Sequence, residues 1–246
     1  MDRIELKALA KINLGLDVLR RREDGYHEVK MIMQTISLYD ELEIRRTKRA
    51  GIQVETNLYY LPTNENNLVY KAAQLLKEEF HIRDGIGIRL QKKIPVAAGM
   101  AGGSSDAAAV LWGMNQMYRL GLSRQELMDR GVKLGADVPY CVLRGTALAE
   151  GIGEKLSVLP PMPKCYILIA KPGISVSKKF VYENLHANDL KPEQHPDVDA
   201  MIQAMEQKDL GLLASRMGNV LETVTVPAYA VIDEIKRFMV EQGALG

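Results

Sequence analysis

Apolar and polar residues alternate along the first part of the chain, and this pattern predicts strands. Every second position is apolar from residue 4 to 8 and again from 12 to 18, as in a strand with one buried face. Asp24-Gly25 is typical of a turn, either a two-residue hairpin or a longer loop. The same alternation predicts strands at residues 29–38, 41–46, 52–55 and 86–90, and a hairpin at 145–158.

Helical spacing of apolar residues begins after the first strands. A helix is expected to follow a cap at Asn66 or Asn67, and an apolar helix is expected over residues 107–118. Ser123 and Glu126 have the spacing of a capping box, which predicts the start of the next helix.

Prolines at positions 160, 161 and 163 mark the best candidate boundary between two domains. Beyond them the pattern predicts a strand at 165–170 and then mostly helices, the last beginning at Pro227. Strands come first and helices follow, with little βαβ alternation. We therefore expect an α+β fold with domains at residues 1–158 and 159–246.

Composition narrows the function classes. The 246 residues carry 32 basic and 31 acidic side chains, and the net charge of +1 argues against a nucleic-acid-binding protein. Cys141 and Cys165, both in apolar stretches, are the only two cysteines, and so few indicate neither a disulfide framework nor a cysteine zinc site. The apolar stretches are too short to cross a membrane, and the first residues do not resemble a secretory signal. The cysteine content fits a protein of the reducing cytoplasm.

A glycine-rich loop, residues 99–105, precedes the predicted apolar helix. Glycines let a backbone approach an anion, and a helix start offers free N–H groups and the positive end of the helix dipole. The loop lacks the lysine of a Walker A motif and is not GxGxxG. It is either a flexible turn or a phosphate-binding loop, and its three glycines and two serines favour phosphate binding.

Two charged residues are candidates for catalysis. Asp137, just past a predicted helix end, either caps a turn or acts as a base that takes or orients a hydroxyl proton. Lys11 is either a surface lysine or a partner that stabilises charge on a transferred phosphoryl group. Asn13 lies on the same strand face as Lys11, so both side chains can reach one site.

Tyr26 and His27 follow the Asp24-Gly25 turn. An aromatic pair at a loop tip can stack on a nucleobase, although a surface position is the ordinary alternative. Tyr182 is a second aromatic candidate, against a core or surface role. The remaining histidines show no metal-ligand spacing.

Six segments, in this order along almost the whole chain, resemble the GHMP kinase superfamily, and most specifically its cytidine-linked methylerythritol kinases. They are ALAKINLGL from residue 8, REDGYH from 22, ENNLVYKAA from 65, KIPVAAGMAGGSSDAA from 93, LGADVP from 134 and EGIGEKL from 150. The resemblance implies a two-domain GHMP kinase fold, ribosomal protein S5 domain 2-like at the N-terminus and ferredoxin-like at the C-terminus.

The implied reaction is transfer of the γ-phosphoryl group of ATP, with Mg²⁺, to the 2-hydroxyl of a cytidine-diphosphate-linked methylerythritol, on the methylerythritol phosphate route to isoprenoids. Asp137 matches the catalytic aspartate and Lys11 its lysine partner. The implied substrate-binding residues are Asn13, Tyr26, His27 and Tyr182. The implied ATP-binding residues are Asn67, Pro95, Gly99, Met100, Ala101, Gly102, Gly103, Ser104 and Ser105.

The chain departs from the family pattern at two places. Ala101 stands where the family usually has glycine, which is tolerable if its φ angle stays negative. The family also carries a third glycine-rich motif, shaped like Ser-Gly-Ser-Gly-Pro, and the sequence reaches Gly246 without it. We therefore expect the second domain to be incomplete at its C-terminus.

Two other functions stay open. One is a different GHMP kinase, of the homoserine, mevalonate or sugar type, which the DGYH segment disfavours. The other is a ligand sensor on the same scaffold, which the presence of both Lys11 and Asp137 disfavours.

Overall fold

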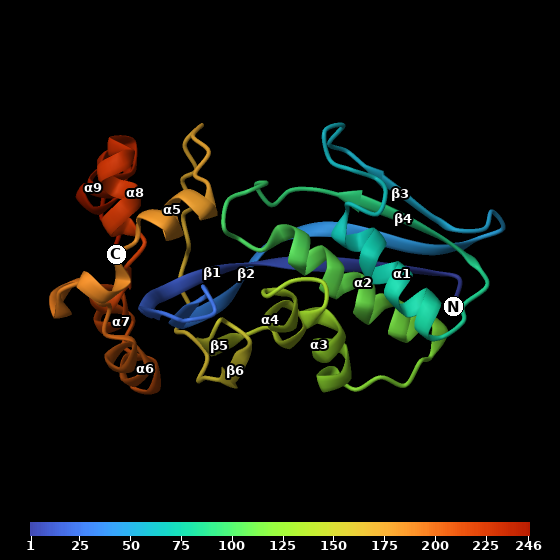
Figure 1. Cartoon of the computed structure of the whole chain (residues 1–246), viewed down its shortest axis with the longest axis horizontal. Helices are drawn as coiled ribbons and strands as arrows, with labels where there is room; N and C mark the ends of the chain where they lie inside the picture. The colour runs from blue at the N-terminus through green and yellow to red at the C-terminus, as the bar shows by residue number, and fades with distance from the viewer. The chain divides into compact units, whose positions relative to one another are not determined.

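The computed structural model describes residues 1–246 apart from the side chain of Lys178, and the chain forms two compact units. The first unit holds residues 1–12 and 35–144, and the second holds 13–34 and 145–246. Strands β1 (Arg3–Arg21) and β2 (His27–Thr47) contribute residues to both units (Figure 1). The mixture of helices and strands confirms the α+β class. The predicted boundary at residue 158 stays a prediction.

The sheet of the first unit is built on β4 (Gly85–Gln91). It pairs antiparallel with the second half of β2, with Ile88 opposite Ile44, and parallel with β3 (Ile52–Thr56). Ile44 and Ile88 are buried, as the apolar alternation of these segments predicts.

The predicted break between residues 38 and 41 is wrong, because β2 continues through Asp40. Aspartate is uncommon in strands, and a buried carboxylate is costly without partners. The Asp40 carboxylate is fully buried and has them: Oδ1 accepts a hydrogen bond of 2.8 Å from the Ile94 backbone N–H, and Oδ2 accepts one from Lys92 Nζ. These partners are remote in sequence, so the local pattern could not reveal them.

Helices α1 (Leu68–Glu79), α2 (Gly102–Tyr118), α3 (Arg124–Val132) and α4 (Val138–Leu143) complete the first unit, and α1 and α2 pack side by side (Figure 1). The Asn67 cap of α1 is confirmed, since its side chain accepts a bond of 3.0 Å from the Val69 N–H. The capping box at the start of α3 is also present. The apolar helix begins at Gly102 rather than near 107, so the last residues of the glycine-rich loop form its first turn.

In the second unit, β1 and β2 are joined by a turn over residues 22–26. The first half of β2 pairs antiparallel with β5 (Thr146–Gly151), which forms the predicted hairpin with β6 (Lys155–Val158). β1 pairs parallel with β7 (Gly218–Asn219). The rest is mostly helical: α5 (Lys178–Asn184), 3₁₀ turns at Ala187–Asp189 and Pro192–Gln194, α6 (Val198–Glu206), α7 (Leu210–Arg216), α8 (Glu222–Ala228) and α9 (Ala230–Glu241).

Three predictions for this unit are wrong. Residues 165–170 form no strand, because a strand needs a ladder partner and none of the described residues supplies one. Cys165 in this segment is exposed rather than surrounded by apolar groups. Pro227 lies in the last turn of α8, and the final helix begins at Ala230. No helix among the described residues has both the length and the apolar character needed to cross a membrane.

Candidate active site

Strand β1 holds the glycine-rich loop at two points. The backbone N–H of Lys11 donates to the carbonyl of Met100 over 3.1 Å, and the hydroxyl of Ser105 donates to the carbonyl of Leu9 over 2.6 Å. The Met100 side chain is buried in a cluster with Ala10, Ile36 and Ile94. These two bonds fix the loop to β1 at Met100 and at Ser105.

The loop backbone adopts left-handed conformations. Gly99 has φ +70°, and a β-carbon there would meet nothing within 4 Å. Ala101 has φ 53°, so the condition that it keep a negative φ is not met. A left-handed alanine costs about 1–2 kcal/mol, because its Cβ crowds the neighbouring carbonyl oxygen. Ala101 therefore holds a backbone conformation that glycine would adopt at lower cost.

The start of α2 presents free backbone donors. Ala101 is the N-cap residue and has no side chain that can bond the first N–H groups. The N–H groups of Gly102, Gly103 and Ser104 therefore have no partner within the helix, and they stand at the positive end of its dipole. This arrangement suits an anion such as a phosphate group.

Beneath the loop lies a buried charge cluster of Lys92, Asp40 and Asp106, which sequence reasoning missed. Lys92 Nζ bonds Asp40 Oδ2 and lies 2.7 Å from Asp106 Oδ2, and all three side chains are at most 5% exposed. A β-carbon on Gly102 would stand only 3.1 Å from Lys92 Nζ. The ammonium group thus packs directly against the backbone where α2 begins.

The two carboxylates of the buried charge cluster are not equivalent. Asp40 accepts bonds on both oxygens, whereas Oδ1 of Asp106 is buried without a partner among the described residues. Burial raises the pKa of Asp106 to about 7, against the attraction of Lys92, and the nearby Asp40 charge raises it further. Asp106 therefore titrates near neutral pH.

Asp137 and Lys11 lie in one electrostatic neighbourhood. Asp137 is the residue before α4, and its side chain makes no capping bond, so the turn-capping alternative does not describe it. Burial raises the pKa of the Cys141 thiol on α4, Asp137 raises it further, and Lys11 lowers it. Both charges therefore act on the same buried group, and Lys11 is itself almost fully buried rather than a surface lysine.

Asn67, placed beside the ATP by the family pattern, lies next to the loop but already has partners. Its amide donates to the Pro62 carbonyl over 2.7 Å in addition to capping α1. The adjacent Leu68 would contact a β-carbon on Gly103 at 3.5 Å, so the start of α1 lies against the first turn of α2. Pro95 is half-buried at the other end of the segment that leads into the loop.

Four predicted substrate-binding residues belong to the second unit. Tyr26 is 60% exposed in the turn, where its N–H bonds Asp24 Oδ1 at 3.1 Å. The His27 and Tyr182 rings are 5.0 Å apart at their centroids and tilted by 41°. Burial and the nearby Arg21 charge lower the pKa of His27, and its Nε2 atom is buried with no partner among the described groups. Asn13 is half-buried in β1.

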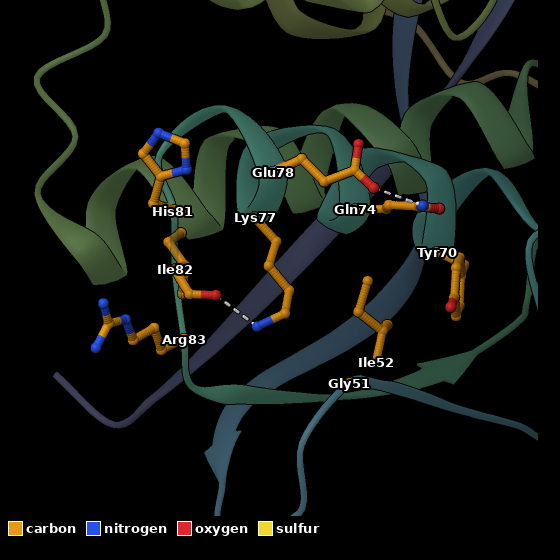
Figure 2. A pocket seen from close by; sticks show the side chains of 9 residues that line it. All are labelled: Gly51, Ile52, Tyr70, Gln74, Lys77, Glu78, His81, Ile82 and Arg83. Carbon is orange, nitrogen blue, oxygen red and sulfur yellow. Dashed lines mark hydrogen bonds between the residues drawn. The ribbon is translucent and has the colours of Figure 1, made fainter.

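A pocket of about 690 Å³ lies elsewhere in the first unit and contains none of the predicted residues. Figure 2 shows two hydrogen bonds among the residues that line it: Lys77 donates to the Ile82 carbonyl at 2.5 Å, and Gln74 donates to Glu78 at 2.7 Å. The side chains of Lys77, Gln74 and Glu78 therefore already have partners within the protein. Its lining is Gly51, Ile52, Tyr70, Gln74, Lys77, Glu78, His81, Ile82 and Arg83.

Comparison with known proteins gives a consistent assignment. The family "GHMP kinases N terminal domain" matches residues 67–145. A 4-diphosphocytidyl-2-C-methyl-D-erythritol kinase of Lachnospira eligens is 59% identical over 245 residues, covering 100% of this chain and 84% of the relative. The kinase of the same name from Acetivibrio thermocellus is 50% identical over 246 residues, covering 100% of this chain and 86% of the relative.

Solved structures of kinases are also similar to this chain. A crystal structure of a 4-(cytidine 5'-diphospho)-2C-methyl-D-erythritol kinase has a TM-score of 0.79 and 31% identity, covering 98% of this chain and 84% of that one. A homoserine kinase from Cytophaga hutchinsonii has a TM-score of 0.69 at 20% identity, covering 100% and 81%, and shares the fold.

The fold and the anchored glycine-rich loop are those of a GHMP kinase, an enzyme class that uses ATP as the phosphoryl donor. Within that class the sequence match is specific along the whole chain. The chain belongs to the 4-diphosphocytidyl-2-C-methyl-D-erythritol kinase family, whose members are transferases of isoprenoid biosynthesis.

Proposed function

We propose that the chain transfers the γ-phosphoryl group of ATP to the 2-hydroxyl of 4-diphosphocytidyl-2-C-methyl-D-erythritol. The observation that carries the proposal is the position of Lys11. Its backbone N–H bonds the glycine-rich loop at Met100, and its ammonium acts on the same buried thiol as Asp137. One short piece of β1 thus links the proposed phosphate site with the proposed base.

In this proposal each group has one task. Asp137 takes or orients the proton of the attacking hydroxyl, because its carboxylate is not used for capping. Lys11 stabilises the charge that spreads over the transferred phosphoryl group. Residues 99–105, with the start of α2, bind the phosphates of ATP, while Pro95 and Asn67 border the nucleotide.

The substrate's cytosine is proposed to bind in the second unit. Exposed Tyr26 supplies a stacking face, and Tyr182 supplies a second aromatic ring beside His27. The unpartnered Nε2 of His27 supplies a polar atom for the cytosine edge. Asn13, half-buried in β1, is proposed as a further substrate-binding residue.

Mg²⁺ is proposed to arrive with ATP. The described residues contain no group of three or more His, Cys, Asp or Glu side chains able to hold a metal ion. This suits Mg²⁺, which is held largely by substrate phosphates and water and needs few protein ligands. When bound, the ion would neutralise charge on the transferring phosphates.

The two-domain division at residue 158 and a location in the bacterial cytoplasm complete the proposal, the second supported by the bacterial origin of the relatives. A substrate panel tests the function directly. With ATP and Mg²⁺ present, we expect phosphorylation of the cytidine-linked methylerythritol and background rates with homoserine, mevalonate and free methylerythritol. A preference for a free alcohol would instead favour another GHMP kinase, and no transfer to any alcohol would favour a ligand sensor.

A further inference from the structure

The buried charge cluster lies where it can respond to ATP. Lys92 Nζ packs against Gly102, and Asp106 follows the glycine-rich loop in the first turns of α2. A triphosphate bound at the helix start places several negative charges next to this cluster. The inference below rests on that proposed ATP site.

The buried charge cluster contains two carboxylates but only one ammonium group. Two carboxylates share the single ammonium of Lys92, so the cluster is negative when both are ionised and neutral when one of them holds a proton. N–H donors stabilise the ionised form of a carboxylate, and Asp40 has them on both oxygens. Asp106 has only Lys92, with Oδ1 left without a partner in the described structure. The proton therefore goes to Asp106.

The groups that face Asp106 come from each packed element. Lys92 follows β4, and Asp40 belongs to β2. On α4 the neutral thiol of Cys141 interacts with Asp106, and Lys11, Asp137 and Arg144 act on that same thiol. Helix α1 faces α2 with apolar side chains: Val69, Ala72, Ala73 and Leu76.

We propose that Asp106 balances charge beneath the glycine-rich loop and takes up one proton from solvent when ATP binds. The phosphates disfavour a second negative charge near the loop, and a protonated Asp106 removes it. Lys92 then pairs with Asp40 alone, and the neutral cluster leaves the positive end of α2 free to attract phosphate. Asp106 is in this account a positioning residue that does not touch substrate.

Proton uptake is measured by calorimetric titration with ATP and excess Mg²⁺. The titration is run in PIPES and in Tris, two buffers of different ionisation enthalpy. Near pH 7 we expect the wild-type chain to take up a fraction of a proton. Asp106→Asn should bind ATP with almost no proton uptake. The matched control is Asp129→Asn, which changes an exposed carboxylate on α3 and should take up protons as the wild type does. Above pH 7 the Kd of the wild type should rise by up to about tenfold per pH unit, while that of Asp106→Asn stays within about twofold.

Carboxyl NMR of the wild-type chain with ¹³C-labelled aspartate gives a reading that needs no variant. One aspartate resonance should move towards its protonated position when ATP is added. Binding of ATP without proton uptake, uptake without movement of an aspartate resonance, or equal uptake in Asp106→Asn would each overturn the inference and leave the proposed function intact. Failure of the wild type to bind ATP at any pH would overturn both.

Discussion

The ammonium of Lys92 lies 2.7 Å from Oδ2 of Asp106, and both side chains are almost completely buried. This ion pair joins the residue that follows β4 to the first turns of α2, next to the glycine-rich loop. The loop that is proposed to bind ATP therefore rests on charged groups as well as on apolar packing.

Removing the Lys92 ammonium should destabilise the protein strongly. Lys92→Met leaves two buried carboxylates without their shared cation, and breaking a buried ion pair in this way costs about 3–5 kcal/mol. Urea unfolding measures the change. The neighbouring Lys93→Met is the matched control and should have little effect, because Lys93 and its partner Glu41 are both well exposed. Equal losses in the two variants would contradict the role given to the cluster.

Replacing Ala101 by glycine should stabilise the folded chain. At φ 53° the alanine carries a penalty of about 1–2 kcal/mol that glycine avoids, partly offset by the greater freedom of glycine in the unfolded chain. Thermal or urea unfolding of Ala101→Gly checks this. Ala98→Gly is the control and should lower stability, because the Ala98 methyl packs on the cluster around Ala10. A destabilised Ala101→Gly would show that the alanine methyl makes compensating contacts.

Stability should depend on pH through Asp106. Its folded-state pKa of about 7 lies above the ordinary carboxyl value, so between these values the folded chain binds more protons than the unfolded chain. The unfolding free energy then falls as pH rises, by up to roughly 1.4 kcal/mol per pH unit from this group. Relative to wild type, Asp106→Asn should be more stable at pH 8 than at pH 5. A pH-independent difference in urea unfolding would refute this.

Asp137→Asn should abolish phosphoryl transfer and leave ATP binding largely intact. The amide keeps the size of the side chain but cannot accept the hydroxyl proton, and the residue makes no capping bond whose loss would disturb α4. Turnover and the Kd for ATP are the two measurements. Turnover near the wild-type value would show that Asp137 is not the base for the attacking hydroxyl.

Tyr26→Ala should weaken binding of the cytidine-linked substrate by about 1–3 kcal/mol and change ATP binding little, because it removes a stacking face. Tyr59→Ala offers a control, since Tyr59 is a fully exposed tyrosine of the first unit with no assigned role. Comparison of KM for the two substrates tests the prediction. Equal effects on both would count against stacking.

The local sequence pattern predicted most elements of the first unit correctly. The alternation of 86–90, the Asn67 cap and the Ser123 capping box are short-range signals, and the structure confirms them. The segment at 165–170 shows that such short-range signals are not sufficient to predict a strand. Its short apolar run is typical of a buried strand, but a strand also requires a partner, and partners depend on the whole chain.

The candidate site likewise has parts that the sequence pattern predicts and parts that it does not. The glycine-rich loop is visible in sequence, because glycines before an apolar helix have few other uses. The buried charge cluster is not visible, because Lys92 sits in a pair of lysines that resembles any charged surface, and Asp40 resembles a break between strands. Only the packing of α2 on the sheet brings them together with Asp106.

The central claim is the reaction itself, and ³¹P NMR of its product tests it most directly. The chain is incubated with ATP, Mg²⁺ and 4-diphosphocytidyl-2-C-methyl-D-erythritol, with Asp137→Asn as a parallel sample. We predict a new ³¹P phosphomonoester resonance, with phosphorus splitting of the C2 signal in the ¹³C spectrum of the product, appearing together with ADP and missing with the variant. ATP converted to ADP without that resonance, or an equal product signal from the variant, would contradict the account.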